Sequence, residues 1–215
     1  MISQPASSDP VERLVSAAPV IPVVTVEDPA TAVALAHALA AGGLTAVEIT
    51  LRTPRALEAI AAVAREAPGV MVGAGTLLSE GQILEAREAG ARFLVSPGST
   101  PRLMEAAARV GLPYLPGCAT VSEAMALLEF GFTHAKFFPA EASGGIAFLK
   151  GVAPVLRAMR FCPTGGIDAA KAREYLRLPN VACIGGSWLV PAEAVAASDW
   201  AVITALARQA TALRG

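Results

Sequence analysis

The 215-residue sequence has little charge and few of the side chains that most often carry catalysis. Charged residues make up 16% of the chain and the formal net charge is −1, so binding to nucleic acid is not expected. Only two histidines are present, His37 in a predicted helix and His134 at the start of a predicted strand. Neither belongs to a metal-ligand pattern with carboxylates or cysteines, and no metal site is predicted.

Cysteines and targeting signals are also scarce. The three cysteines form no C-x-x-C pair, and their odd number does not suit a disulfide framework, so reduced thiols in a cytoplasmic protein are expected. The first residues, MISQPASSD, lack a basic region followed by an apolar one, so no signal peptide is predicted. The uncharged stretch 29–47 contains His37 and a Gly-Gly pair. A buried helix and a strand explain it better than a membrane span does.

Hydrophobic residues, in contrast, make up 54% of the chain and recur in a regular unit. Each unit has a short apolar run, a capping residue, an alanine-rich helical segment and usually a glycine. The predicted strands are Val20–Val26, Ala46–Leu51, Met71–Thr76, Phe93–Pro97, Pro113–Cys118, His134–Pro139, Arg160–Gly165 and Val181–Gly186. Strands alternating with helices predict parallel pairing through right-handed crossovers.

These eight units predict an α/β fold, a closed (β/α)8 TIM barrel in a single domain over residues 1–215. An extra N-terminal helix is expected over about Pro10–Ala17, and the last helix over about Ser198–Leu213. The alternative is a doubly wound open sheet, but no G-x-G-x-x-G motif follows the first strand. Helix caps are predicted at Asp28, Thr53, Thr100, Ser79, Ser122 and Asp168, and left-handed helix ends at Gly42, Gly90, Gly111 and Gly131.

One strand contains a lysine, and this is unusual. Lysine is depleted from strands and is rarely buried without a reason, yet Lys136 lies in the apolar run His134–Pro139. A lysine held in a hydrophobic wall can become a nucleophile, whereas an edge strand would leave it in solvent. The alternation of the strand makes Phe138 its neighbour on the same face, where a ring could exclude water.

The second strand carries a glutamate and an arginine in phase. Glu48, Thr50 and Arg52 share one face, and aliphatic residues share the other. If the aliphatic face meets the helices, Glu48 and Arg52 point into the barrel or its mouth. A structural ion pair is the alternative interpretation. Because barrel active sites lie at the carboxyl ends of strands, Thr76 and Pro97, at the ends of the third and fourth strands, are further candidates.

Glycine pairs follow the last two strands. Gly165-Gly166 ends the seventh strand, and Gly185-Gly186 with Ser187 ends the eighth. Barrel phosphate sites use these two loops, where exposed backbone N–H groups and a helix N-terminus bind the anion. Two tight turns are the alternative. A lysine, a carboxylate and a phosphate site together suit imine chemistry on a phosphorylated carbonyl compound, with Glu141 a rival to Glu48 as the base.

The motifs GGLTAVEITLRT, GAGT, SPG, KFFPAE, FCPTGGI and IGGSWLVP resemble those of the 2-keto-3-deoxy-6-phosphogluconate (KDPG) and 4-hydroxy-2-oxoglutarate (KHG) aldolases. The resemblance spans about residues 20 to 191. It implies a Schiff-base role for Lys136 and a proton shuttle at Glu48. Because an ionised carboxylate close by would favour the charged lysine, Glu48 is expected to act through a water or at a short remove. It further implies carboxylate and pyruvyl binding by Arg52, Thr76, Pro97 and Phe138, and phosphate binding by Gly165, Gly166 and Ser187.

The resemblance also implies a lyase of the Entner–Doudoroff pathway that needs no metal or other cofactor and forms a homotrimer. Its substrate would be a small phosphorylated keto acid, with no nucleic acid or membrane as a partner. An aldolase for the phosphogalactonate epimer is one alternative. A phosphosugar isomerase or epimerase on the same barrel is another, and a non-catalytic binder of phosphate ligands is a third.

Overall fold

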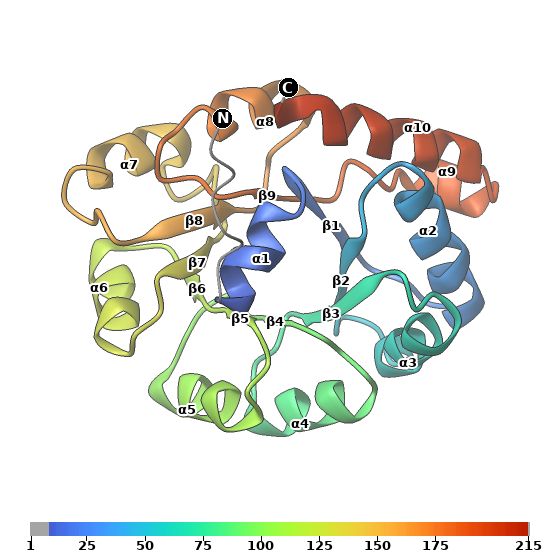
Figure 1. Ribbon diagram of the computed structural model, residues 1–215, viewed down its shortest axis with the longest axis horizontal. Helices are drawn as coiled ribbons and strands as arrows, with labels where there is room; N and C mark the ends of the chain where they lie inside the picture. The colour runs from blue at the N-terminus through green and yellow to red at the C-terminus, as the bar shows by residue number, and fades with distance from the viewer. Residues whose placement is uncertain (1–8, 215) are drawn as a thin grey trace, which may run out of the picture.

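The computed structural model describes residues 9–214, which form a ring of parallel strands surrounded by helices (Figure 1). The strands are β1 Val20–Val24, β2 Ala46–Thr50, β3 Met71–Gly75, β4 Leu94–Val95, β5 Tyr114–Leu115, β6 Gly117–Cys118, β7 His134–Phe137, β8 Arg160–Pro163 and β9 Ile184–Gly186. The helices are α1 Pro10–Ser16, α2 Pro29–Ala41, α3 Ala56–Glu66, α4 Glu80–Glu88, α5 Pro101–Val110, α6 Val121–Glu129, α7 Gly145–Val152, α8 Ala169–Leu176, α9 Ala192–Ala196 and α10 Trp200–Thr211, with a 3₁₀ turn at Ala212–Arg214. The segment 1–8, in which no signal peptide is predicted, lies outside the described residues.

The ring of strands is closed. One sheet has the order β5-β4-β3-β2-β1-β9 and a second has the order β6-β7-β8, with every pair parallel. Two further parallel bridges, Phe161 with Val181 and Thr164 with Gly185, join β8 to the segment that contains β9. The chain itself joins β5 to β6. The predicted (β/α)8 barrel is therefore confirmed, and the open sheet is wrong.

The predicted fifth strand is divided by Pro116. Before it, β5 pairs with β4; after it, β6 pairs with β7. Proline has no N–H to donate to a ladder, which explains the interruption. The carbonyl of Pro116 still accepts a 2.9 Å hydrogen bond from the N–H of Lys136. The break therefore lies beside the strand that carries the candidate nucleophile and helps to fix its backbone.

The two faces of each strand meet different surroundings. On β2, Val47 and Ile49 belong to the large apolar cluster shared with the helices, while Ala46 belongs to a second cluster inside the barrel. On β7, the ring of Phe137 stacks on Phe148 of α7 with centroids 4.8 Å apart. Because neighbouring side chains alternate, Glu48 and Lys136 point to the interior, as the strand pattern predicted for Glu48.

Helix α1 covers the amino-terminal end of the barrel, and Figure 1 shows it lying across the ring. Leu14 and Val15 pack into the interior cluster. Glu12 Oε2 lies 2.7 Å from Nε2 of His134, the first residue of β7. The extra N-terminal helix is confirmed, and it leaves the opposite end, where the strands finish, for a substrate.

Most predicted helix starts are confirmed. The side chains of Asp28, Ser79, Thr100 and Asp168 each accept an N–H from the first turn of a helix. The prediction at Thr53 is wrong, because its hydroxyl donates to the carbonyl of Val26 and α3 begins only at Ala56. Ser122 is also wrong, because Thr120 caps α6 and forms a capping box with Glu123.

The helix ends differ from the prediction at one glycine. Gly90, Gly111 and Gly131 have positive φ, whereas Gly42 is right-handed at φ −88° and its neighbour Gly43 takes φ +95°. Position 42 favours glycine for a different reason, because a Cβ at Gly42 would overlap Ala207 of α10. Helix α9 was not predicted, and α10 begins at Trp200 rather than at Ser198. Within residues 9–214, no helix is long and apolar enough to cross a membrane.

Candidate active site

Lys136 lies inside the barrel and is 3% exposed. Its partners in the sheet are Gly117 of β6 and Cys162 of β8. Its Nζ is 3.0 Å from Oε1 of Glu48, and both side chains are 4% exposed. The expectation that Glu48 acts through a water or at a short remove is therefore wrong for this state of the protein, since the two groups touch directly. A proton can pass between them without an intermediary.

Gly75 makes this contact possible. It stands opposite Thr50 in the register of β2 and β3, and a Cβ at Gly75 would overlap the carboxylate of Glu48. The strand end that is rich in glycine thus leaves room for a carboxylate from the neighbouring strand.

Replacing Gly75 by alanine should therefore displace the Glu48 carboxylate from Lys136. Because misplacement of a reacting group by about 1 Å can cost on the order of 100-fold, we expect kcat for substrate cleavage to fall by about 10- to 100-fold. Steady-state kinetics with a circular-dichroism melt would test this. Gly69→Ala is the matched control, because nothing lies within 4 Å of a Cβ there, and it should change little. Equal activity of the two variants would contradict the packing argument.

Four other predicted residues lie at or just beyond the carboxyl ends of the strands. The guanidinium of Arg52 is exposed, and its Nε donates a 3.2 Å bond to the hydroxyl of Thr76. Thr76 has φ +61°, a left-handed conformation that is an outlier for a β-branched residue and is typical of functional sites. The backbone of Pro97 packs closely against Gly117 of β6, and a Cβ at Gly117 would overlap the Pro97 backbone. The ring of Phe138 is centred 5.4 Å from Lys136 Nζ.

A cavity of about 120 Å³ extends from Arg52 and Phe138 to the glycine loops. Its lining residues are Val23, Thr25, Arg52, Phe138, Thr164, Gly165, Gly166, Ile167, Gly185 and Ser187. Five of the nine predicted site residues thus line one cavity, and they come from the ends of β2, β7, β8 and β9. Lys136, Glu48, Thr76 and Pro97 do not line it, but Phe138 connects it to the buried amine.

The Gly165-Gly166 loop has the geometry of an anion site. Both glycines have positive φ, +104° and +78°. In the described part of the chain, no acceptor takes a hydrogen bond from the N–H of Gly166 or Ile167. Ile167 is a buried residue, and a buried N–H without a protein partner points to a ligand or an ordered water, whereas Gly166 is exposed. Helix α8 begins just beyond, at Ala169, and the exposed Ser187 adds a hydroxyl across the cavity.

Two hydroxyls that line this cavity, those of Thr25 and Thr164, are not among the residues predicted from the sequence. Thr25 Oγ1 is 2.8 Å from Thr50 Oγ1, and Thr50 donates to the carbonyl of Val24 at 3.1 Å. Since a hydroxyl has one proton, Thr25 donates to Thr50, and its own lone pairs remain for a ligand donor. The hydroxyl of Thr164 donates to the carbonyl of Cys162 at 3.3 Å, so its lone pairs also remain for a ligand donor. Their position at the carboxyl ends of strands is the signal that could have found them.

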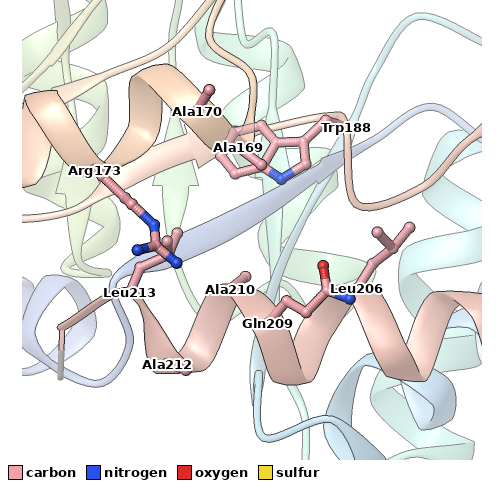
Figure 2. A pocket seen from close by; sticks show the side chains of 9 residues that line it. All are labelled: Ala169, Ala170, Arg173, Trp188, Leu206, Gln209, Ala210, Ala212 and Leu213. Carbon is pink, nitrogen blue, oxygen red and sulfur yellow. The ribbon is translucent and has the colours of Figure 1, made fainter.

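A larger cavity of about 440 Å³ lies elsewhere, in the outer layer of helices. It runs between α8 and α10, with Arg173 and Trp188 above it and Leu206 and Leu213 on the α10 side (Figure 2). It contains none of the predicted site residues. As for metals, no group of three or more His, Cys, Asp or Glu residues in the described part of the chain is placed to hold an ion.

The fold and the site together define a barrel enzyme with a buried lysine–carboxylate pair next to a cavity lined by glycine loops. Residues 11–206 match the family model described as "Aldolase: KDPG and KHG aldolase". The chain belongs to the KDPG and KHG aldolase family, whose members are carbon–carbon lyases.

Its relatives are similar over nearly their whole length. The KHG/KDPG aldolase of Escherichia coli K12 is 50% identical over 199 residues, which cover 93% of each chain. A crystal structure of KDPG aldolase from Legionella pneumophila, with pyruvate captured as a covalent carbinolamine, has a TM-score of 0.91 at 45% identity, covering 94% of this chain and 98% of that one. The KDPG aldolase of Zymomonas mobilis ZM4 with 3-phosphoglycerate also has a TM-score of 0.91, at 46% identity, covering 96% and 97%.

Proposed function

We propose that this chain is a Schiff-base aldolase that cleaves KDPG to pyruvate and D-glyceraldehyde 3-phosphate, and KHG to pyruvate and glyoxylate. The observation that carries the proposal is the buried Lys136–Glu48 pair next to Phe138 and the cavity. The carbinolamine of the Legionella relative and the 3-phosphoglycerate of the Zymomonas relative support it, since they represent the two halves of the expected reaction.

The reaction begins at Lys136. Its neutral amine attacks the C2 ketone, and loss of water from the carbinolamine gives a protonated imine. The interior position of Lys136 and the ring of Phe138, centred 5.4 Å from Nζ, limit the access of water to the amine. Glu48, 3.0 Å from Nζ, can take the proton that the attacking amine releases and return it to the carbinolamine hydroxyl, which leaves as water, so that Glu48 is again a carboxylate for the next step.

Cleavage then uses the imine as an electron sink. Glu48 removes the proton of the C4 hydroxyl, the C3–C4 bond breaks, and its electrons pass to the imine nitrogen. The aldehyde leaves, and the resulting enamine takes a proton at C3 from Glu48. Attack of water on the regenerated imine releases pyruvate and restores the amine. The steps run in reverse for aldol addition.

The remaining site residues bind the two ends of the substrate in this proposal. Arg52, held by Thr76, pairs with the carboxylate, and Pro97 and Phe138 contact the pyruvyl part. The phosphate accepts the N–H groups of the Gly165-Gly166 loop and the Ser187 hydroxyl. Glu141 is a weaker candidate for the base, because its carboxylate is already bonded to Lys171 and Tyr175 and does not line the cavity.

A cytoplasmic homotrimer is part of the proposal. Large apolar side chains are exposed, including Leu78 at 67% and Met125 at 50% on α6. Exposed apolar surface of this kind is typical of subunit interfaces.

The test of the function is a comparison of kcat/KM on KDPG, its galactonate epimer and KHG, with pyruvate detected through lactate dehydrogenase. We expect KDPG to have the highest value, because the anion cradle adds binding that KHG cannot use. Higher activity on the galactonate epimer would transfer the proposal to that substrate. An absence of pyruvate from all three would favour the isomerase or the non-catalytic binder.

A further inference from the structure

Glu141, Lys171 and Tyr175 form a side-chain cluster outside the cavity, and the proposed mechanism does not use it. One carboxylate oxygen of Glu141 accepts a 2.5 Å bond from Lys171 Nζ, and the other accepts a bond from the hydroxyl of Tyr175. The bond from Lys171, followed by that from Tyr175, holds the pKa of Glu141 below its ordinary value. The carboxylate is therefore ionised at neutral pH and fully engaged.

The cluster is hydrogen-bonded to the glycine loop by residues that do not line the cavity. The N–H of Glu141 donates to the carbonyl of Gly165 at 3.2 Å, and Lys171 Nζ reaches the carbonyl of Gly166 at 3.4 Å. The Glu141 side chain also packs on Gly166, where a Cβ would lie 2.8 Å from its Cγ. Two successive carbonyls of the loop are thus held by residues of the β7–α7 loop and of α8.

Holding these carbonyls fixes the direction of the loop's N–H groups. In a trans peptide the C=O and the next N–H point in opposite directions. A Gly165 carbonyl tied to Glu141 turns the Gly166 N–H away from the cluster, and a Gly166 carbonyl tied to Lys171 does the same for Ile167. These N–H groups have no protein acceptor in residues 9–214, and both residues line the cavity.

We propose that Glu141, Lys171 and Tyr175 are positioning residues that orient the Gly165-Gly166 loop for a phosphate group and so set the preference for phosphorylated over unphosphorylated keto acids. The proposal rests on the aldolase function above. It assigns the cluster to substrate specificity and no proton transfer to Glu141. Lys171 supplies the cation that is bonded to the loop. Among the residues that line the cavity, the sole cationic side chain is that of Arg52.

The test is the variant Glu141→Gln, with Lys171→Met as a second variant. We expect KM for KDPG to rise about tenfold, with kcat/KM for KHG within about twofold of wild type. The reason is that each variant removes the charge-assisted bond between Glu141 and Lys171, which positions Lys171 against the Gly166 carbonyl. Inhibition of KHG cleavage by inorganic phosphate should weaken by a similar factor. The matched control is Glu66→Gln, which breaks the 2.5 Å pair between Arg65 and Glu66 on α3 and should change none of these values.

Two results would overturn the proposal. Equal losses of kcat on KDPG and KHG would place Glu141 in the chemistry or in general stability, and an unchanged KM and phosphate inhibition would leave the cluster without a role at the cradle. Thermal melts of both variants separate instability from a specific effect. Failure of the aldolase function itself looks different, because the wild-type protein would then release no pyruvate from either substrate.

Discussion

Replacing Lys136 by arginine abolishes cleavage of KDPG and KHG, with a loss in kcat of at least about 10⁴-fold. Arginine keeps a positive charge beside Glu48, so the buried carboxylate is not left without a partner, but a guanidinium is not deprotonated in proteins and cannot form the imine. Pyruvate release in the coupled assay and a circular-dichroism melt of the same sample measure the two effects.

Lys150→Arg is the matched control for this experiment. Lys150 lies on α7, is exposed, and has no part in the proposed chemistry. Its variant should keep activity within about twofold, as surface substitutions usually do. Substantial turnover by a folded Lys136→Arg variant would contradict the imine mechanism.

Replacing Glu48 by glutamine has the second-largest expected effect. Glutamine keeps the size of the side chain and an acceptor for Lys136 Nζ, but it cannot take the C4 hydroxyl proton. General-base catalysis contributes about 10²- to 10⁴-fold, so we expect kcat to fall by that amount with a smaller change in KM. Single-turnover kinetics separate the cleavage step from imine formation.

The direction of the Glu48 and Glu141 results decides between the two candidate bases. Glu48→Gln should impair KDPG and KHG equally, because both substrates carry the C4 hydroxyl. Glu141→Gln should impair the phosphorylated substrate selectively. The reverse pattern would assign the base to Glu141 and would leave the buried pair of Glu48 and Lys136 as a structural feature.

The sequence was sufficient to predict the barrel and the position of most site residues. Period-two alternation on β2 predicted that Glu48 points inward, and the apolar run around Lys136 predicted its burial; both residues are buried. Both predictions depend on local pattern and on the general rule that barrel sites lie at the carboxyl ends of strands, so they needed no distances. The glycine pairs of the last two loops were predictable for the same reason.

Features that depend on packing between distant segments could not be predicted. The direct Lys136–Glu48 contact requires the missing Cβ of Gly75 on a neighbouring strand. The contacts of Glu141 and Lys171 with the glycine loop depend on a bond between these two side chains, which are 30 positions apart in the sequence. Thr53 resembled a helix cap, but its hydroxyl bonds instead to the carbonyl of Val26, across 27 residues. In each case the sequence names the groups, and only the folded chain decides which partner each one meets.

The central claim is that Lys136 forms the covalent bond to substrate. The direct test is to incubate the protein with pyruvate and borohydride, digest it and locate the reduced adduct by peptide mass spectrometry. The mechanism predicts one pyruvyl adduct, on Lys136, and none after Lys136→Arg. An adduct on Lys150 or Lys171, or no adduct on a protein that still cleaves substrate, would contradict it.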